Sequence, residues 1–165
     1  MDEIIRLDNI SQFNALRGIE TFHPLASVID FSKMKLIPEA RAHYGFYCVF
    51  LKESVCGDLK YGCNYYDYQE GTMVFIAPGQ IAGIGNKPGS AKPKGWGLIF
   101  HPDLIRGTSL GLNIKKYTFF SYEANEALHL SDRERQVVMD CLENIDQELR
   151  QSMAKHSKTL SAKNI

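Results

Sequence analysis

The strongest constraint on the fold is a series of short β-prone runs between about Phe22 and Phe100. Each run is rich in Val, Ile, Phe and Tyr, and Gly, Pro, Asn or Asp residues interrupt the series at short intervals. Because no helical period separates these runs, the sequence predicts a sandwich or barrel such as a jelly roll. The clearest runs are Ser27–Phe31, Gly45–Leu51, Leu59–Cys63, Tyr65–Tyr68, Thr72–Ile76 and Gly97–Phe100.

Three regions follow from this pattern, and together they predict a mainly β protein with C-terminal helices. Residues 1–20 are expected to form an N-terminal arm with a short helical turn, and residues 21–101 the β-barrel. Within the barrel, residues 79–94 are rich in glycine and proline and are expected to form a surface loop. Residues 102–165 form a helical segment, which begins with a short helix around residues 101–105.

A long amphipathic helix is predicted over residues 131–153. Ser131 and Glu134 form a capping-box pattern at its start. One apolar stripe follows, made of Val138, Leu142, Ile145 and Leu149. The stripe is narrow and spaced like a coiled-coil seam, so we expect it to form a homodimer interface. The alternative is that it packs on the barrel of its own chain. The polar end after Lys155 looks like the start of another helix and is expected to be truncated.

The composition bears on partners and on location. Lys plus Arg and Asp plus Glu both number 19, so the formal net charge is zero. Surfaces that bind nucleic acid usually carry a basic excess, and we therefore expect no DNA binding by this chain alone. The four cysteines form no C-x-x-C pair and are expected to be reduced thiols of a cytoplasmic protein. No signal peptide or membrane span is recognisable.

No constellation of residues points to catalysis. The five histidines all lie more than four residues apart, and the sequence has no G-x-S-x-G elbow, phosphate-binding loop or calcium loop. We therefore expect no catalytic residue, no metal and no cofactor.

An aromatic-rich barrel can hold one small ligand at its mouth. Arg41 and His43 lie just before the run that begins at Gly45. The fork of an arginine suits a carboxylate, and a histidine can donate or accept a hydrogen bond. Trp96, the only tryptophan, could supply an apolar stacking wall. We predict ligand contacts at these three residues; a surface or capping role is the alternative for Arg41 and His43.

Three segments resemble the N-terminal domain of AraC-type transcription regulators. Tyr68–Gln80 resembles the cupin strand-turn-strand that closes on Pro-Gly, and Gly95–Thr108 is similar to the segment that ends the barrel in these regulators. Phe119–Leu130, followed by the long helix, continues the resemblance, which covers roughly residues 20 to 155. The resemblance implies a cupin-like jelly-roll barrel that senses a small-molecule effector and dimerises. It also implies a DNA-binding domain of two helix-turn-helix units, downstream of residue 165.

The metal-binding pattern of cupin enzymes is not matched. Only His43 is near the expected histidine pair, with Tyr44 and Gly45 where the second histidine would stand, and Gln80-Ile81-Ala82 follows the Pro-Gly turn. The sequence therefore favours a ligand-sensing and dimerisation domain of a bacterial regulator. A stand-alone cupin enzyme, either an isomerase or a dioxygenase, and a purely structural β-module are the alternatives.

Overall fold

The computed structural model describes residues 3–53, 72–85, 94–117 and 128–163. Within these ranges the strands form two sheets, of three and five strands, with orders β1-β3-β6 and β2-β7-β4-β5-β8. The first sheet consists of β1 (Ile4–Leu7), β3 (Ala40–Tyr44) and β6 (Ile81–Ile84). The second consists of β2 (Ala26–Asp30), β4 (Tyr47–Lys52), β5 (Thr72–Ile76), β7 (Gly95–Phe100) and β8 (Leu128–His129).

Four α-helices belong to the described part of the chain: α1 (Ile10–Leu16), α2 (Pro102–Ile105), α3 (Ser109–Asn113) and α4 (Asp132–Lys163). Short 3-10 helices cover Phe31–Lys33 and Ile114–Lys116. The expected β-rich fold with C-terminal helices is therefore confirmed, whereas the jelly-roll topology stays a prediction. The expected strands at 59–63 and 65–68 lie outside the described residues.

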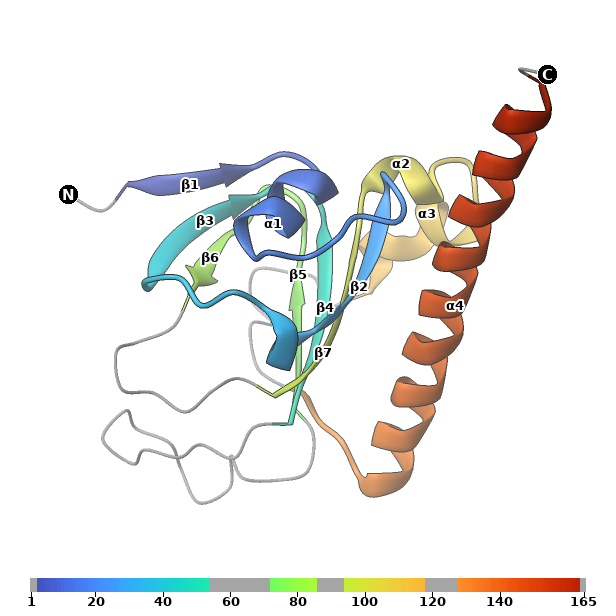
Figure 1. Cartoon of the computed structure of the whole chain (residues 1–165). Helices are drawn as coiled ribbons and strands as arrows, with labels where there is room; N and C mark the ends of the chain where they lie inside the picture. Colours follow the sequence, from blue (N-terminus) through green and yellow to red (C-terminus); the bar gives the residue numbers. More distant parts are fainter. Residues whose placement is uncertain (1–2, 54–71, 86–93, 118–127, 164–165) are drawn as a thin grey trace, which may run out of the picture.

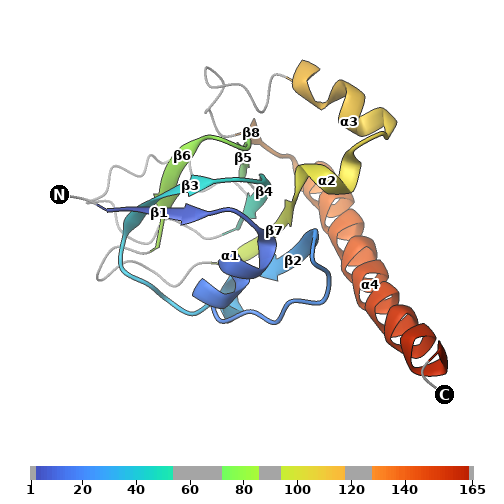
Figure 2. The same cartoon turned by 90° about the horizontal axis from the view of Figure 1, so that it is seen from above.

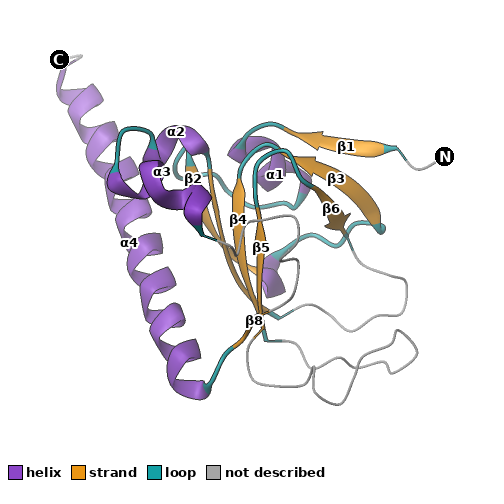
Figure 3. Cartoon of the chain, turned by 180° about the vertical axis from the view of Figure 1, so that it is seen from behind, coloured by secondary structure: helices purple, strands orange, loops and turns teal. Residues whose placement is uncertain are grey.

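The molecule is layered. The five-stranded sheet lies between the three-stranded sheet on one side and α4 on the other (Figures 1 and 3). Seen from above, α1 lies beside the sheets at the end of β1, and α2 and α3 lie on the side of α4 (Figure 2). Side chains alternate between the two faces of each strand, so every strand of the five-stranded sheet has one face toward each neighbouring layer.

The main core fills the space between the two sheets. It joins inward side chains of both sheets with residues of α1, and its fully buried members include Ile10, Ile29, Phe46, Cys48 and Ile99. Two smaller clusters lie on the opposite face of the five-stranded sheet and contain side chains of α4. The two faces of this sheet are thus both apolar, as expected for a central layer.

The capping box at the start of α4 is confirmed. The Ser131 hydroxyl accepts from the backbone N–H of Glu134 at 3.2 Å, and the Glu134 carboxylate accepts from the N–H of Ser131 at 3.2 Å. The helix ends at Lys163 rather than at residue 153, and its last turns project beyond the two sheets (Figure 1).

Two segments differ from their expected structure. The supposed arm contains β1, which pairs in parallel with β3 in a register that runs from Ile4–Arg41 to Leu7–Tyr44. The supposed loop 79–94 contains β6, which pairs antiparallel with β3. Each strand has only four residues, too few to show a clear period in the sequence, and each is defined by its pairing with β3.

Candidate ligand-binding site

Arg41 and His43 lie on the same face of β3, and this is the outer face of the three-stranded sheet. Ala42 and Tyr44, which alternate with them, are buried in the core between the sheets. Arg41 is exposed, whereas His43 is half-buried and its Nδ1 atom is buried without a hydrogen-bond partner among the described residues. The two side chains therefore lie on one face of β3, outside the core between the two sheets.

Trp96 lies on a different layer. It is opposite Leu51 on β4 and Asp30 on β2, and paired residues of an antiparallel sheet share a face. Leu51 belongs to a cluster that contains side chains of α4, so Trp96 is on the α4 side of the five-stranded sheet. The structure does not bring Trp96 into one site with Arg41 and His43, because two sheets and their shared core separate them.

The apolar stripe of α4 packs on its own chain. Leu142 is 5% exposed, Leu149 packs against the cluster around Phe100, and Val138 packs against the cluster around Leu51. Ile145 is half-buried. The stripe packs there because the outer face of the five-stranded sheet is apolar and must be buried against another element. This is the alternative that the sequence left open. A homodimer contact through Val138, Leu142 and Leu149 would have to displace these side chains from their own chain.

A cluster of polar side chains that the sequence did not reveal lies beneath α1. The amide nitrogen of Asn14 donates to the hydroxyls of Thr21, at 3.1 Å, and of Ser27, at 3.3 Å. Asn14 is fully buried and Arg17, three residues further on, is 3% exposed. Arg17 is the C-cap residue that follows α1, about one turn after Asn14, and both side chains are buried. We call Asn14, Arg17, Thr21 and Ser27 the interior polar cluster.

The interior polar cluster is incompletely satisfied. The Oδ1 atom of Asn14 and the Nε and Nη1 atoms of Arg17 are buried without a hydrogen-bond partner among the described residues. Burial lowers the pKa of the Arg17 guanidinium, while the nearby Tyr44 acts in the opposite direction. Burial also raises the pKa of the Tyr44 phenol well above its ordinary value. Tyr44 therefore stays neutral and provides no counter-charge for Arg17.

A pocket of about 430 Å³ opens beside α1, and it is lined by Asn9, Ser11, Thr21, His23 and Pro24. Pockets of a few hundred Å³ accommodate small organic molecules. Thr21 belongs both to this pocket and to the interior polar cluster, so the pocket wall is one hydrogen bond away from Asn14.

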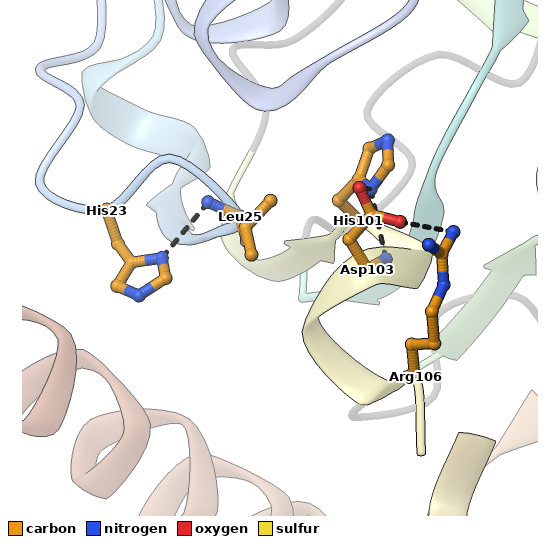
Figure 4. A network of polar contacts seen from close by, with 5 residues as sticks. All are labelled: His23, Leu25, His101, Asp103 and Arg106. Atoms are coloured by element: carbon orange, nitrogen blue, oxygen red, sulfur yellow. Dashed lines mark hydrogen bonds and ion pairs between the residues drawn. The ribbon is translucent and has the colours of Figure 1, made fainter. Parts of the chain in front are cut away.

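Figure 4 shows the polar contacts of the pocket loop, at His23 and Leu25, and those at the end of β7, at His101, Asp103 and Arg106. His23 accepts through Nδ1 from the backbone N–H of Leu25, at 3.0 Å, and the Leu25 carbonyl accepts from the N–H of His101, at 2.8 Å. His101 accepts in turn from the N–H of Asp103, whose carboxylate pairs with Arg106 at 2.6 Å. The loop that lines the pocket is thus held to the start of α2.

The same loop contacts α4. The guanidinium of Arg150 lies 4.2 Å from the centre of the Phe22 ring, a cation–π geometry. Arg150 is held in turn by Asp146, one helical turn earlier, at 3.1 Å. Residues 21–25 therefore have neighbours in the interior polar cluster, in the pocket and on α4.

The two described cysteines are free thiols. Cys48 is completely buried, and burial raises the pKa of its thiol well above the ordinary value, which makes the reactive thiolate scarce. Cys141 is exposed on α4.

Comparisons with known protein families, with curated proteins and with solved structures found no match to this chain. Within the ranges that the structure describes, no three His, Cys, Asp or Glu side chains lie close enough together to hold a metal ion. None of the helices in those ranges combines the length and the apolar character that crossing a bilayer requires.

Proposed function

We propose that this chain is the ligand-sensing and dimerisation domain of a bacterial transcription regulator of the AraC type, with a cupin-like jelly-roll barrel. In this proposal DNA is bound by a helix-turn-helix domain outside these 165 residues, and the chain itself is a cytoplasmic binding module rather than an enzyme. The β-rich fold with a long C-terminal helix agrees with the resemblance of its segments to such regulators.

One observation carries the sensing role. The loop of residues 21–25 lines the pocket, is bonded to the interior polar cluster through Thr21, and contacts α4 through Phe22. A ligand that orders this loop would also change the surroundings of Arg150 on α4. A ligand shifts a conformational equilibrium only through different contacts with the two states, and this loop offers such contacts. In this mechanism α4 carries the signal away from the barrel.

A ligand screen followed by hydrogen exchange tests the coupling. Compounds that raise the Tm of residues 1–165 are added to the protein, and amide exchange in α4 is measured. We expect ligand to slow exchange in the part of α4 around Arg150. The variant Arg150→Met should still be stabilised by ligand but should lose this response, whereas Arg133→Met, at an exposed position of the same helix, should keep it. A ligand that leaves α4 unchanged in the wild type contradicts the proposal.

Two further measurements test dimerisation and the absence of catalysis. Sedimentation velocity at high micromolar concentration should show a homodimer, and a purely monomeric chain would contradict this part of the proposal. The ligand should be recovered unchanged after long incubation with the protein. Conversion of the ligand into a product would favour the stand-alone enzyme instead.

A further inference from the structure

We propose that the interior polar cluster binds a small organic carboxylate, with Arg17 pairing with the carboxylate. In the same proposal, Asn14 accepts a hydrogen bond from a hydroxyl or amino group of that ligand. The inference rests on the proposed sensing function and deepens it by naming the class of ligand and the residues that recognise it.

The charge of Arg17 is the first argument. A buried guanidinium without an anionic partner is costly, by several kcal/mol, unless a partner is supplied. Its Nε and Nη1 atoms are buried and have no hydrogen-bond partner, and no ion pair joins Arg17 to a residue that the structure describes. Tyr44, which lies near it, is neutral. Within the described part of the chain, the fold thus buries a cation and supplies no counter-ion, and a bound ligand would provide one.

The hydrogen-bonding capacity of Asn14 is the second argument. An amide group offers two N–H donors and one carbonyl acceptor. Both donor positions are occupied by the hydroxyls of Thr21 and Ser27, while Oδ1 is buried and has no described partner. The cluster therefore offers unpaired donors on Arg17 and an unpaired acceptor on Asn14. A molecule that carries a carboxylate and a nearby O–H or N–H group complements both.

The net charge narrows the ligand class. Arg17 is the one cation of the cluster, so it balances a single negative charge. A phosphate monoester carries close to two charges at neutral pH and would leave charge buried in a medium of low dielectric constant. A carboxylate is planar, carries one charge and matches the arginine fork.

The pocket provides room for the rest of the molecule. Thr21, which lines it, accepts a hydrogen bond from Asn14, so the pocket borders the interior polar cluster at Thr21. The carboxylate would reach inward to Arg17, and the remainder would occupy the 430 Å³ next to Thr21 and His23.

Matched probes and variants test this site in the 165-residue chain. The probes are lactate and mandelate, each compared with its analogue without the hydroxyl (propionate, phenylacetate), with its neutral amide, and with phenyl phosphate. At roughly ten times its Kd, a carboxylate should raise the Tm of the wild type by about 3–5 °C. The analogues without a hydroxyl should bind more weakly, and the amides and phenyl phosphate should give no shift. Arg17→Met should abolish every carboxylate shift, whereas Arg133→Met, on the exposed face of α4, should preserve it.

The unliganded variants provide a readout that needs no probe. If Arg17 lacks a partner in the free protein, Arg17→Met should fold with a Tm equal to or above that of the wild type, because it removes an uncompensated buried charge. A clearly lower Tm of Arg17→Met would show that the fold satisfies Arg17 internally, and would overturn the proposal. So would a carboxylate shift that survives in Arg17→Met, or the absence of any carboxylate shift in the wild type.

Failure of this inference and failure of the proposed function have different signatures. A neutral compound that raises the Tm and slows exchange in α4, independently of Arg17, would overturn the carboxylate site and support sensing. A carboxylate that binds through Arg17 and leaves exchange in α4 unchanged would support the carboxylate site and overturn the proposed sensing function.

Discussion

The outer faces of the two sheets meet different surroundings. On the three-stranded sheet, the outer face exposes Arg6 of β1, Arg41 of β3 and Ile81 of β6, and no described helix packs on it (Figure 3). On the five-stranded sheet, the outer face carries apolar side chains such as Tyr47 and Phe100, whose rings stack at 5.0 Å, and α4 covers it along β2 and β7. The two sheets share one core, but only the five-stranded sheet has a helix packed on its outer face among the described residues.

This difference follows from the sequences of the strands. In β3, Ala-Arg-Ala-His-Tyr alternates between small or apolar and polar residues, which suits a strand with one face in water. In β4, the first five residues, Tyr-Cys-Val-Phe-Leu, are all apolar or aromatic and only the last, Lys52, is charged, so both faces of the strand require a cover. A strand that is apolar on both faces therefore identifies the sheet that receives the helix. Five predictions test the comparison, in order of decreasing effect.

Truncating Leu142, in the middle of the α4 face that packs on the sheet, should have the largest effect on stability. Leu142 is 5% exposed, and Leu142→Ala should lower the free energy of unfolding by about 2–4 kcal/mol because it leaves a cavity between α4 and the sheet. Val137, which is 57% exposed on the opposite side of the helix, is the matched control. Val137→Ala should change stability by less than about 0.5 kcal/mol. Urea unfolding followed by circular dichroism measures both, and equal losses would mean that the helix does not cover the sheet.

The capping box should contribute less to stability than Leu142 does. Ser131→Ala removes the hydroxyl that caps α4 and should cost about 1 kcal/mol, whereas Ser131→Asp, which can also cap, should restore most of it.

The cap also predicts a pH dependence. The hydrogen bond from Ser131 holds the pKa of the Glu134 carboxyl below its ordinary value of 4.5. A lowered pKa gives stability that is present above the ordinary value and is lost as the pH falls through the folded value. The difference in the free energy of unfolding between the wild type and Ser131→Ala should therefore become smaller as the pH falls below 4.5. Urea titrations at a series of acidic pH values measure it, and a constant difference would rule out a role for the carboxylate.

An ion pair at the base of α4 should have a smaller effect. Arg135 pairs with Glu53, which directly follows β4, although Oε1 of Glu53 does not meet hydrogen-bond geometry. Because both side chains are partly exposed, Arg135→Met should cost only about 0.5–1 kcal/mol. The loss should shrink in high salt, since salt screens the pair. Arg133→Met, at an exposed neighbour, should show neither effect, and a loss at Arg135 that is independent of salt would indicate packing instead.

The outer face of the three-stranded sheet should tolerate substitution with little loss of stability. Arg41 is exposed and forms no ion pair with a described residue, so Arg41→Ala should alter the free energy of unfolding by less than about 0.5 kcal/mol. A larger loss would show that this face of β3 is covered in solution, and would contradict the contrast between the two sheets.

Much of the secondary structure could be predicted from local sequence. Thr72–Ile76 was predicted with its observed bounds, Ser27–Phe31 is shifted by one residue from β2, and the Ser131 cap is where the pattern indicated. These elements carry their signal in their own residues: a β-prone run, a turn, or a hydroxyl three residues before a carboxylate. The apolar stripe of α4 was also recognised from its spacing, but it was predicted as a homodimer interface, whereas in the structure it packs on its own chain.

The tertiary structure decided which surfaces meet. The sequence contained the stripe of α4 but not its partner, because an apolar stripe fits a sheet of its own chain as well as a second chain. The sequence predicted that Arg41 and Trp96 contact the same ligand, whereas the order of the strands places them on opposite sides of the core. Arg17 gave no signal in the sequence, since an arginine at the end of a short helix is usually exposed. Its burial depends on how α1 docks on two sheets whose strands are far apart in the chain, and such long-range contacts leave no local period to detect.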